Sequence, residues 1–502
     1  MSALKAPDRH MLTRNHFTHI ALNVSGMVLP MLAGVAVVPG LIHRLGQDRF
    51  GALTLAWALV GYFGLLDLGL GRALTQYLSQ HNATGMPLTV QAAMARMARR
   101  LMWGLGATWA MLLLVCTPWV GTAIQMPAEV RAEAAVAWAM LAMAIPFLMW
   151  STCSTGVLEA RSRFTAVNCV RIPSGIASFC LPWLIARYSV DLRAVMAGLL
   201  LLRIGTALAF AWLARQEFAH APHAPPSNGL RQLLHFGGWL TVSNLVGPLL
   251  SYFDRFAIAA LISTAAVTQY TVPFDVLSRL PAIPVAMLGV LFPLLAHAQG
   301  HSGTSAAVLP DLVRSATRML VACWLPGLIG LTVLGPWLLH WWVGPEIAQR
   351  SSVVWQWLAV GVLVNGFAHI PYNLLQSAGR TDLIAKIHLG ELIPYGIALW
   401  WALVHWGIVG AASVWTLRVV VDTLLLFTYA IRQFPASQSA LRRALQWAAA
   451  GGATVTLIGT FKSPMFTYST ASVETPWQML ILVLACALAW CSYQMFLLFR
   501  KK

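Results

Sequence analysis

Long apolar stretches recur along the whole chain, and short polar stretches separate them. Each apolar stretch has about 20 residues, the length that a helix needs to cross a bilayer, so the pattern predicts membrane-spanning helices. We place fourteen spans, at residues 17–42, 50–72, 101–124, 132–158, 166–186, 194–214, 236–262, 271–296, 319–343, 351–378, 387–404, 408–431, 445–461 and 476–499.

Composition excludes a soluble protein. Of the 502 residues, 58% are hydrophobic and 10% are charged, whereas about 25% of residues are charged in an ordinary soluble protein. The net charge of +17 does not indicate nucleic-acid binding, because the basic residues occur in small groups between apolar runs. The seven cysteines lie in apolar segments without metal-ligand spacing, so we expect neither a metal site nor a cofactor.

The basic residues also predict the orientation in the membrane. With the N-terminus in the cytoplasm, 21 of the 33 Lys and Arg residues fall on the cytoplasmic side, 7 fall on the opposite side and 5 lie inside spans. Positively charged segments tend to stay in the cytoplasm. We therefore expect both termini to be cytoplasmic.

A proline-rich connection, residues 215–235, divides the chain near its middle and indicates two bundles. Its His220 and His223 lack a third ligand and are interpreted as solvated. Four residues of the first span, Val24, Ser25, Pro30 and Leu32, recur 218 positions later as Val242, Ser243, Pro248 and Leu250. We expect an all-α fold of two pseudo-symmetric bundles around a central cavity: residues 1–222 and 223–432 with six helices each, then 433–502 with two more.

Ten charged residues lie inside the predicted spans, where each one costs roughly 2.5 to 3.5 kcal/mol at mid-depth unless it is paired or hydrated. They are therefore candidates for function. The acids are Asp67, Asp254, Asp275, Glu391 and Asp422, and the arginines are Arg171, Arg203, Arg255, Arg279 and Arg418.

The spacing of these charges suggests how they pair. Asp275 and Arg279, like Arg418 and Asp422, are four residues apart, so each couple would share a helix face and could form a local ion pair. Arg171 and Glu391 lie near cytoplasmic span ends, from which their side chains can extend to the interface.

Arg203 has no acid near it in the sequence, so we expect its partner to be another helix or an anionic ligand. Arginines at mid-depth favour an anionic substrate, because the guanidinium carries a fixed charge and a fork of donors suited to phosphate. Buried carboxylates beside them leave room for coupling to protons or sodium.

Several short motifs resemble a known family, the Wzx-type polysaccharide flippases. This family belongs to the superfamily of multidrug, oligosaccharidyl-lipid and polysaccharide exporters, which also contains the lipid II flippase. The matching residues are Leu45, Gly46, Phe50, Gly51, Tyr62, Phe63 and the run LLDLGLGRA at residues 65–73; then Gly156, Leu158, Glu159, Arg163 and Phe164; then Phe236, Gly238, Trp239, Asp254, Arg255 and Phe256; and finally Thr271, Pro273, Phe274, Phe292 and Pro293.

The resemblance implies a carrier in the bacterial inner membrane that moves oligosaccharide repeat units linked to undecaprenyl diphosphate from the inner to the outer leaflet. Alternating access of the two bundles would supply the movement. It also implies a role in O-antigen, capsule or exopolysaccharide synthesis. The expected partners are the lipid-linked oligosaccharide, membrane lipid, a coupling proton or sodium ion, and polysaccharide polymerase and chain-length proteins.

Two alternatives remain open. A multidrug extruder of the same superfamily, exchanging organic cations, should have a cavity dominated by acids and aromatic rings, and the five arginines in spans count against it. An O-antigen ligase or polymerase should carry a large outward loop with catalytic groups. The longest outward loop here covers only residues 462–475, so we expect a transporter and not an enzyme.

Overall fold

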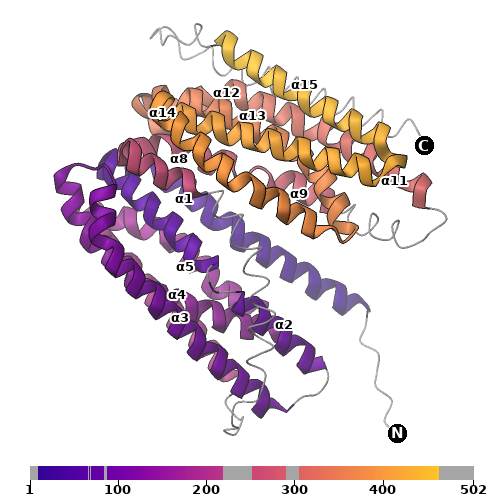
Figure 1. Cartoon of the computed structure of the whole chain (residues 1–502). Helices are drawn as coiled ribbons and strands as arrows, with labels where there is room; N and C mark the ends of the chain where they lie inside the picture. Colours follow the sequence, from indigo (N-terminus) through magenta and orange to yellow (C-terminus); the bar gives the residue numbers. More distant parts are fainter. Residues whose placement is uncertain are drawn as a thin grey trace, which may run out of the picture. The chain divides into compact units, whose positions relative to one another are not determined.

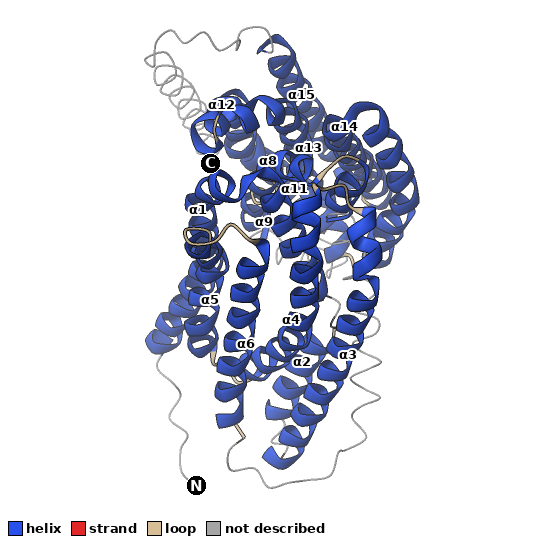
Figure 2. Cartoon of the chain, turned by 90° about the vertical axis from the view of Figure 1, so that its left-hand side faces the viewer, coloured by secondary structure: helices blue, strands red, loops and turns tan. Residues whose placement is uncertain are grey.

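The computed structural model of the chain describes residues 9–65, 67, 69–83, 87–218, 252–289 and 305–462. Within these residues every regular element is a helix and no strand is present (Figures 1 and 2), which confirms the predicted all-α class. Nine helices of this part are long and apolar enough to cross a membrane. The predicted total of fourteen spans remains a prediction, because the span at 476–499 and parts of three others lie outside the described residues.

The chain divides into two compact units, Met1–Ala265 and Ala266–Lys502. The predicted boundary at 222/223 and the second copy of the sequence repeat both lie outside the described residues. The first unit contains the helices α1 (Arg9–Leu65), α2 (Leu70–Ala83), α3 (Leu88–Ala123), α4 (Ala128–Ala160), α5 (Phe164–Ile185) and α6 (Leu192–Gln216), together with a helical segment at 252–261.

The second unit begins within the first turn of α8 (Thr264–Leu277) and includes α9 (Ala282–Gly289). It continues with α11 (Ser305–Met319), which is followed by a π-helical turn at Leu320–Trp324. The helices α12 (Leu325–Val343), α13 (Pro345–Ser377), α14 (Thr381–Gln433) and α15 (Gln438–Lys462) follow, with a short 3-10 turn at Pro435–Ser437 before α15.

Two of these helices are too long for one crossing, and each is broken at a glycine. α1 has 57 residues and α14 has 53, against about 20 for a span. Gly46 (φ 77°, ψ 168°) interrupts α1 and Gly407 (φ 59°, ψ −143°) interrupts α14. Because side chains other than glycine rarely adopt these angles, the two glycines mark the points where each helix divides, as the predicted pairs of spans require.

The two arms of α14 run antiparallel. Three contacts join them. Arg380 Nη1 donates to Gln433 Oε1 at 3.1 Å, His388 Nε2 lies 3.5 Å from Asp422 Oδ1, and Glu391 Oε2 lies 3.4 Å from Arg418 Nη1. Residue numbers rise on one arm as they fall on the other, which is the pattern of a helical hairpin. We call this element the α14 hairpin.

α4 is the central helix of the first unit, since it packs against α1, α2, α3, α5 and α6. Glycine permits its closest approach to α3: a Cβ atom at Gly106 would lie 2.7 Å from the backbone Cα of Pro146. Such small-residue contacts are typical of packed membrane helices, where van der Waals contact replaces the hydrophobic effect as the main attraction.

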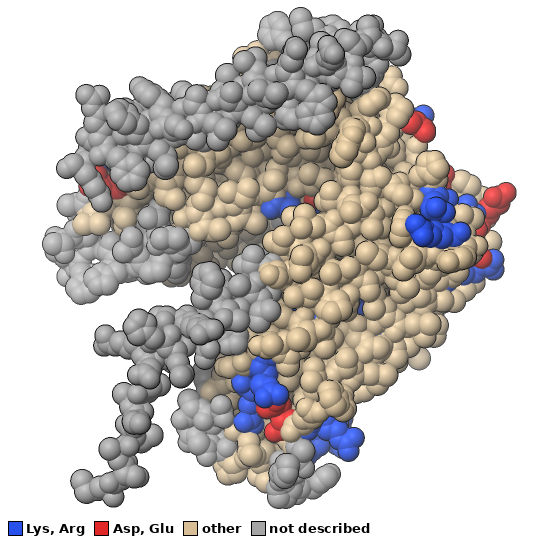
Figure 3. Space-filling view, turned by 180° about the vertical axis from the view of Figure 1, so that it is seen from behind, with Lys and Arg blue, Asp and Glu red and all other residues tan. Residues whose placement is uncertain are grey.

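Large apolar side chains remain exposed on the helices. Met111, Trp119, Leu201 and Trp212 are each at least 64% exposed. On the face drawn in Figure 3, Lys, Arg, Asp and Glu gather in separate regions, and an extended uncharged surface lies between them. An exposed apolar surface of this extent fits contact with lipid, in agreement with a multi-pass membrane protein.

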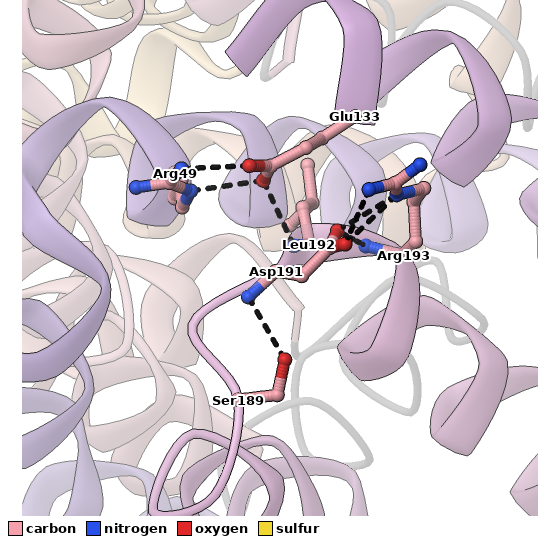
Figure 4. Close-up of polar contacts among 6 residues, drawn as sticks. All are labelled: Arg49, Glu133, Ser189, Asp191, Leu192 and Arg193. Atoms are coloured by element: carbon pink, nitrogen blue, oxygen red, sulfur yellow. Dashed lines mark hydrogen bonds and ion pairs between the residues drawn. The ribbon is translucent and has the colours of Figure 1, made fainter. Parts of the chain in front are cut away.

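An ion-paired network joins α1, α4 and the start of α6 (Figure 4). Glu133 Oε1 lies 2.6 Å from Arg49 Nη2, and its Oε2 accepts hydrogen bonds from Arg49 Nε at 2.9 Å and from the backbone N–H of Leu192 at 3.0 Å. Asp191 caps α6 by accepting the backbone N–H of Arg193 at 2.8 Å. The side chain of Arg193 also bonds to Asp191 and lowers the pKa of its carboxyl group.

We expect Glu133→Gln to lower the stability of the folded protein. The substitution removes one charge of a two-pronged pair that is only 22% and 12% exposed, and charge-assisted bonds of this kind contribute on the order of 1 to 3 kcal/mol. Thermal unfolding in detergent, followed by tryptophan fluorescence, should show a lower midpoint.

Arg193→Gln serves as the control, because its pair with Asp191 is 52% and 30% exposed and an exposed pair contributes little to stability. In the double variant Arg49→Gln with Glu133→Gln, the unfolding midpoint should fall by less than the sum of the decreases in the two single variants. Strictly additive effects would contradict a direct pair.

Candidate functional site

The structure separates the ten candidate charges between the two units. Asp67, Arg171, Arg203, Asp254 and Arg255 belong to the first unit, and Asp275, Arg279, Glu391, Arg418 and Asp422 belong to the second. Four arrangements account for most of them: a helix cap, surface ion pairs, one cation without a partner among the described residues, and a buried cluster in the α14 hairpin.

Asp67 caps a helix. The residue is 7% exposed and precedes α2. Its Oδ1 accepts the N–H of Gly69 at 2.9 Å, and its Oδ2 accepts the N–H of Gly71 at 3.1 Å. The first N–H groups of a helix have no partner within the helix, and a carboxylate satisfies them while favouring the positive end of the helix dipole.

The glycines around Asp67 follow from the same geometry. Gly69 has φ 64°, and a Cβ atom at Gly71 would lie 2.8 Å from Asp67 Oδ2 and 2.7 Å from a methyl group of Thr152. The run LLDLGLGRA is therefore explained by the entry into α2, so the burial of Asp67 does not require a ligand.

Arg171 forms an ion pair at the surface. Its Nη2 lies 2.9 Å from Glu159 Oε1, with the two side chains 44% and 34% exposed. This placement agrees with the predicted extension of Arg171 toward the interface. Glu391 differs from its prediction: it is 7% exposed and lies inside the α14 hairpin, because Arg418 on the other arm provides an opposite charge there.

Asp254 and Arg255 share the helical segment 252–261 and are both buried, at 0% and 5% exposure. Asp254 Oδ1 accepts the backbone N–H of Arg255 at 2.8 Å. The Arg255 guanidinium lies over the ring of Tyr252, 5.3 Å from its centroid, which is a favourable cation–π position.

Asp275 and Arg279 do not share a helix. α8 ends at Leu277, and Arg279 lies in the turn that follows, where its N–H donates to Val276 O at 3.4 Å and its side chain is exposed. Asp275 remains half-buried within α8. Because α8 ends between Asp275 and Arg279, the two residues do not share the helix face that their spacing predicted.

Arg203 lies near the midpoint of α6 and is half-buried. Its guanidinium forms neither an ion pair nor a hydrogen bond with the described residues. The expectation that the partner of Arg203 is another helix or an anionic ligand therefore stays a prediction.

The α14 hairpin contains a buried cluster of charged groups. Arg418 pairs across the hairpin with Glu391 at 3.4 Å, and not with Asp422 on its own arm; its guanidinium also lies 5.6 Å from the centroid of the Tyr395 ring. Asp422 faces His388 at 3.5 Å and acts electrostatically on the half-buried ring of His369 from α13. We call these six residues the hairpin cluster.

The hairpin cluster holds two carboxylates for one arginine. Within the described structure, Glu391 Oε1, Asp422 Oδ1, Arg418 Nε and His369 Nε2 are buried without a hydrogen-bond partner. A buried carboxylate that lacks compensation is costly. The arrangement can therefore accept one further positive charge, supplied by a proton on His388 or a carboxyl group, or by a small cation.

Sequence reasoning missed His369 and His388. Both lie in apolar stretches without metal-ligand spacing, so the search for ligand motifs did not include them. His388 stands three residues before Glu391 and therefore shares its helix face, a signal that could have included it. His369 comes from a different helix, and only the fold brings it to Asp422.

Residues 12–299 match the family described as polysaccharide biosynthesis protein. A candidate O-antigen transporter of Shigella flexneri is 30% identical over 407 residues, which cover 80% of this chain and 95% of that protein. The chain belongs to the polysaccharide biosynthesis protein family. The predicted resemblance is confirmed, and with it the interpretation as a transporter and not an enzyme.

Solved structures show the fold of this family member. An inward-facing multidrug transporter of the MATE family aligns with a TM-score of 0.66 at 14% identity, covering 84% of this chain and 99% of that one. The lipid II flippase MurJ aligns with a TM-score of 0.60 at 13% identity, covering 89% and 98%. At these identities the likeness establishes the fold alone.

We expect Arg418→Gln to destabilise the protein by about 3 to 5 kcal/mol, because it leaves two buried carboxylates without their cation. Lower abundance in the membrane and a lower unfolding midpoint in detergent would report the effect. The second substitution Glu391→Gln should restore most of the loss, since it removes the direct partner. Equal or better rescue by Asp422→Asn would contradict the pairing across the hairpin.

Proposed function

We propose that this protein moves oligosaccharide repeat units, carried on undecaprenyl diphosphate, from the inner to the outer leaflet of a bacterial inner membrane. The observation that carries the proposal is its family membership, together with the relative named as a candidate O-antigen transporter, 95% of whose length is matched. The product would serve surface polysaccharide synthesis, and polymerase and chain-length proteins would act on it next.

The charges support an anionic substrate. A diphosphate needs cationic partners in a site shielded from water, and Arg203 is a half-buried cation in an apolar helix without a partner among the described residues. Arg279 is a second cation whose side chain is exposed. Arginine suits this role because its donors form paired hydrogen bonds with phosphate oxygens.

The hairpin cluster supports ion coupling. Its two carboxylates exceed its one arginine, so binding a proton or a sodium ion would neutralise the cluster and release of that ion would restore its charge. Such a change can bias two conformations of a carrier by its differential effect on them. In this proposal, alternating access moves the substrate, and the ion bound by the hairpin cluster drives it.

The likeness to multidrug transporters does not favour drug export. It concerns fold at 14% identity. Organic cations would be repelled by Arg203, which has no carboxylate paired with it in the described structure. We also propose that both termini are cytoplasmic, as the distribution of basic residues predicts.

Deletion of the gene should remove surface polysaccharide while lipid-linked repeat units are still made, because the outward loops are too short to hold glycan chemistry. Gel analysis of surface polysaccharide and mass spectrometry of lipid extracts would measure both. Periplasmic access of a glycosidase to the repeat units should be lost. Normal surface polysaccharide in a strain without a related carrier would exclude the proposal.

Arg203→Ala should reduce polysaccharide output per folded protein by about tenfold or more, because it removes a cation that no described acid neutralises. Arg203→Lys should recover part of the output, since lysine keeps the charge and loses the planar fork. Arg193→Gln, on the exposed end of the same helix, is the matched control and should retain full output. Wild-type output from Arg203→Ala at equal abundance would place the anion site elsewhere.

A further inference from the structure

A cavity of about 460 Å³ lies at the end of the first unit that the sequence predicts to face the cytoplasm. Three helices line it, and each contributes side chains at positions i, i+3, i+4 and i+7, one helix face apiece. The lining residues are Ala92, Ala95, Arg96 and Arg99 of α3; Trp150, Cys153, Ser154 and Val157 of α4; and Ala211, Ala214 and Arg215 of α6 with Phe218 just beyond it.

The packing of the three helices creates this space. α4 packs against both α3 and α6, whereas α3 and α6 do not pack closely against each other within the described residues. Figure 2 shows α4 between the other two helices. The cavity therefore opens over α4, with basic side chains from α3 and α6 on its two sides. We call it the arginine cavity.

The arginine cavity is strongly cationic. Arg96, Arg99 and Arg215 line it, and none of its described lining residues is acidic. The acids nearby in sequence are engaged elsewhere, since Glu159 pairs with Arg171 and Glu217 lies 3.3 Å from Arg163. Nothing described on the cavity wall neutralises the three guanidinium groups.

Two donors in the arginine cavity are unused. Nη2 of Arg96 and Nε1 of Trp150 are buried and have no hydrogen-bond partner in the described structure. A buried donor without a partner loses its hydrogen bonds to water and gains none in the protein, which costs about 1 to 3 kcal/mol of stability. Arg96 and Arg99 also stand three residues apart on one face, where like charges repel. An anion in the cavity would remove both costs.

Arg161 links two residues beside the arginine cavity, Phe218 and Gln91. Its guanidinium lies over the Phe218 ring, 5.4 Å from the centroid, and its Nη2 donates to Gln91 Oε1 at 3.0 Å. It thus ties the end of α4 to α3 and to the segment after α6. The three arginines lie on helices, so the positions of their backbones are preorganised for a ligand, while Arg99 and Arg215 remain exposed and accessible.

We propose that the arginine cavity binds the diphosphate of the lipid-linked substrate as it enters from the inner leaflet. The inference rests on the proposed function and names the site of first contact. Three arginines and an indole N–H match the oxygens of two phosphate groups. The volume falls within the roughly 300 to 1,000 Å³ of small-ligand sites, and basic pockets between membrane helices on the cytoplasmic side are suited to phosphate headgroups.

Binding of farnesyl diphosphate to the full-length protein in nanodiscs of zwitterionic lipid tests the proposal. Farnesyl diphosphate should bind, farnesol should not, and binding should weaken as salt increases. Arg96→Gln with Arg215→Gln should reduce affinity at least about tenfold. Trp150→Phe keeps the ring packed against Trp103 and removes one donor, so it should reduce affinity by a smaller factor without affecting the fold.

The control is Arg442→Gln with Arg443→Gln, an exposed pair on α15 in the other unit, which should bind as the wild type does. Unchanged affinity in both the arginine and the tryptophan variants would overturn the inference. Equal competition by phosphatidylglycerol would also overturn it, since the cavity would then hold a phospholipid headgroup. These failures are distinct from failure of the proposed function, which would appear as normal surface polysaccharide in the deletion strain.

Discussion

The cost of placing a charged side chain away from water governs how this chain uses its charges. Each such group costs roughly 2.5 to 3.5 kcal/mol at the centre of a bilayer unless backbone donors, an opposite charge, an aromatic face or a ligand compensates it. Asp67 meets the requirement with the N–H groups of Gly69 and Gly71. Arg418 meets it with Glu391. Arg203 finds no described compensation, and for that reason it is central to the proposed function.

The two units differ in the charges that they place away from water. In the first, uncompensated charge is positive: Arg203 within α6, and the three arginines of the arginine cavity at the end predicted to be cytoplasmic. In the second, the hairpin cluster combines two carboxylates, two histidines and one arginine. A carrier for an anionic lipid headgroup needs cations that meet the headgroup, and an ion-coupled carrier needs an acid that changes its charge. In the proposed function, the first unit would supply the cations and the second unit the acid.

Glycine positions make the charge clusters possible. The break at Gly407 turns α14 back on itself, and this reversal alone brings residues 391 and 418 together. The turn into α2 depends on Gly69, whose φ of 64° lets Asp67 reach the helix end. Backbone conformations that other residues rarely adopt therefore decide which charges meet.

The sequence by itself determined the membrane environment, the helical class and the family, because apolar runs of about 20 residues and short motifs are local features. It also identified Arg203, since the absence of a nearby acid can be seen along the chain. Only the tertiary structure decided the pairing of Arg418 with Glu391 over Asp422 and the convergence of Arg96, Arg99 and Arg215. In the sequence, those three arginines indicated orientation only, because all of them lie outside the predicted spans. Arg96 and Arg99 belong to α3 because this helix begins at Leu88, well before the predicted start of its span at residue 101. Their contacts depend on how α3 and α6 pack against α4, and no local pattern encodes the distance between two helices.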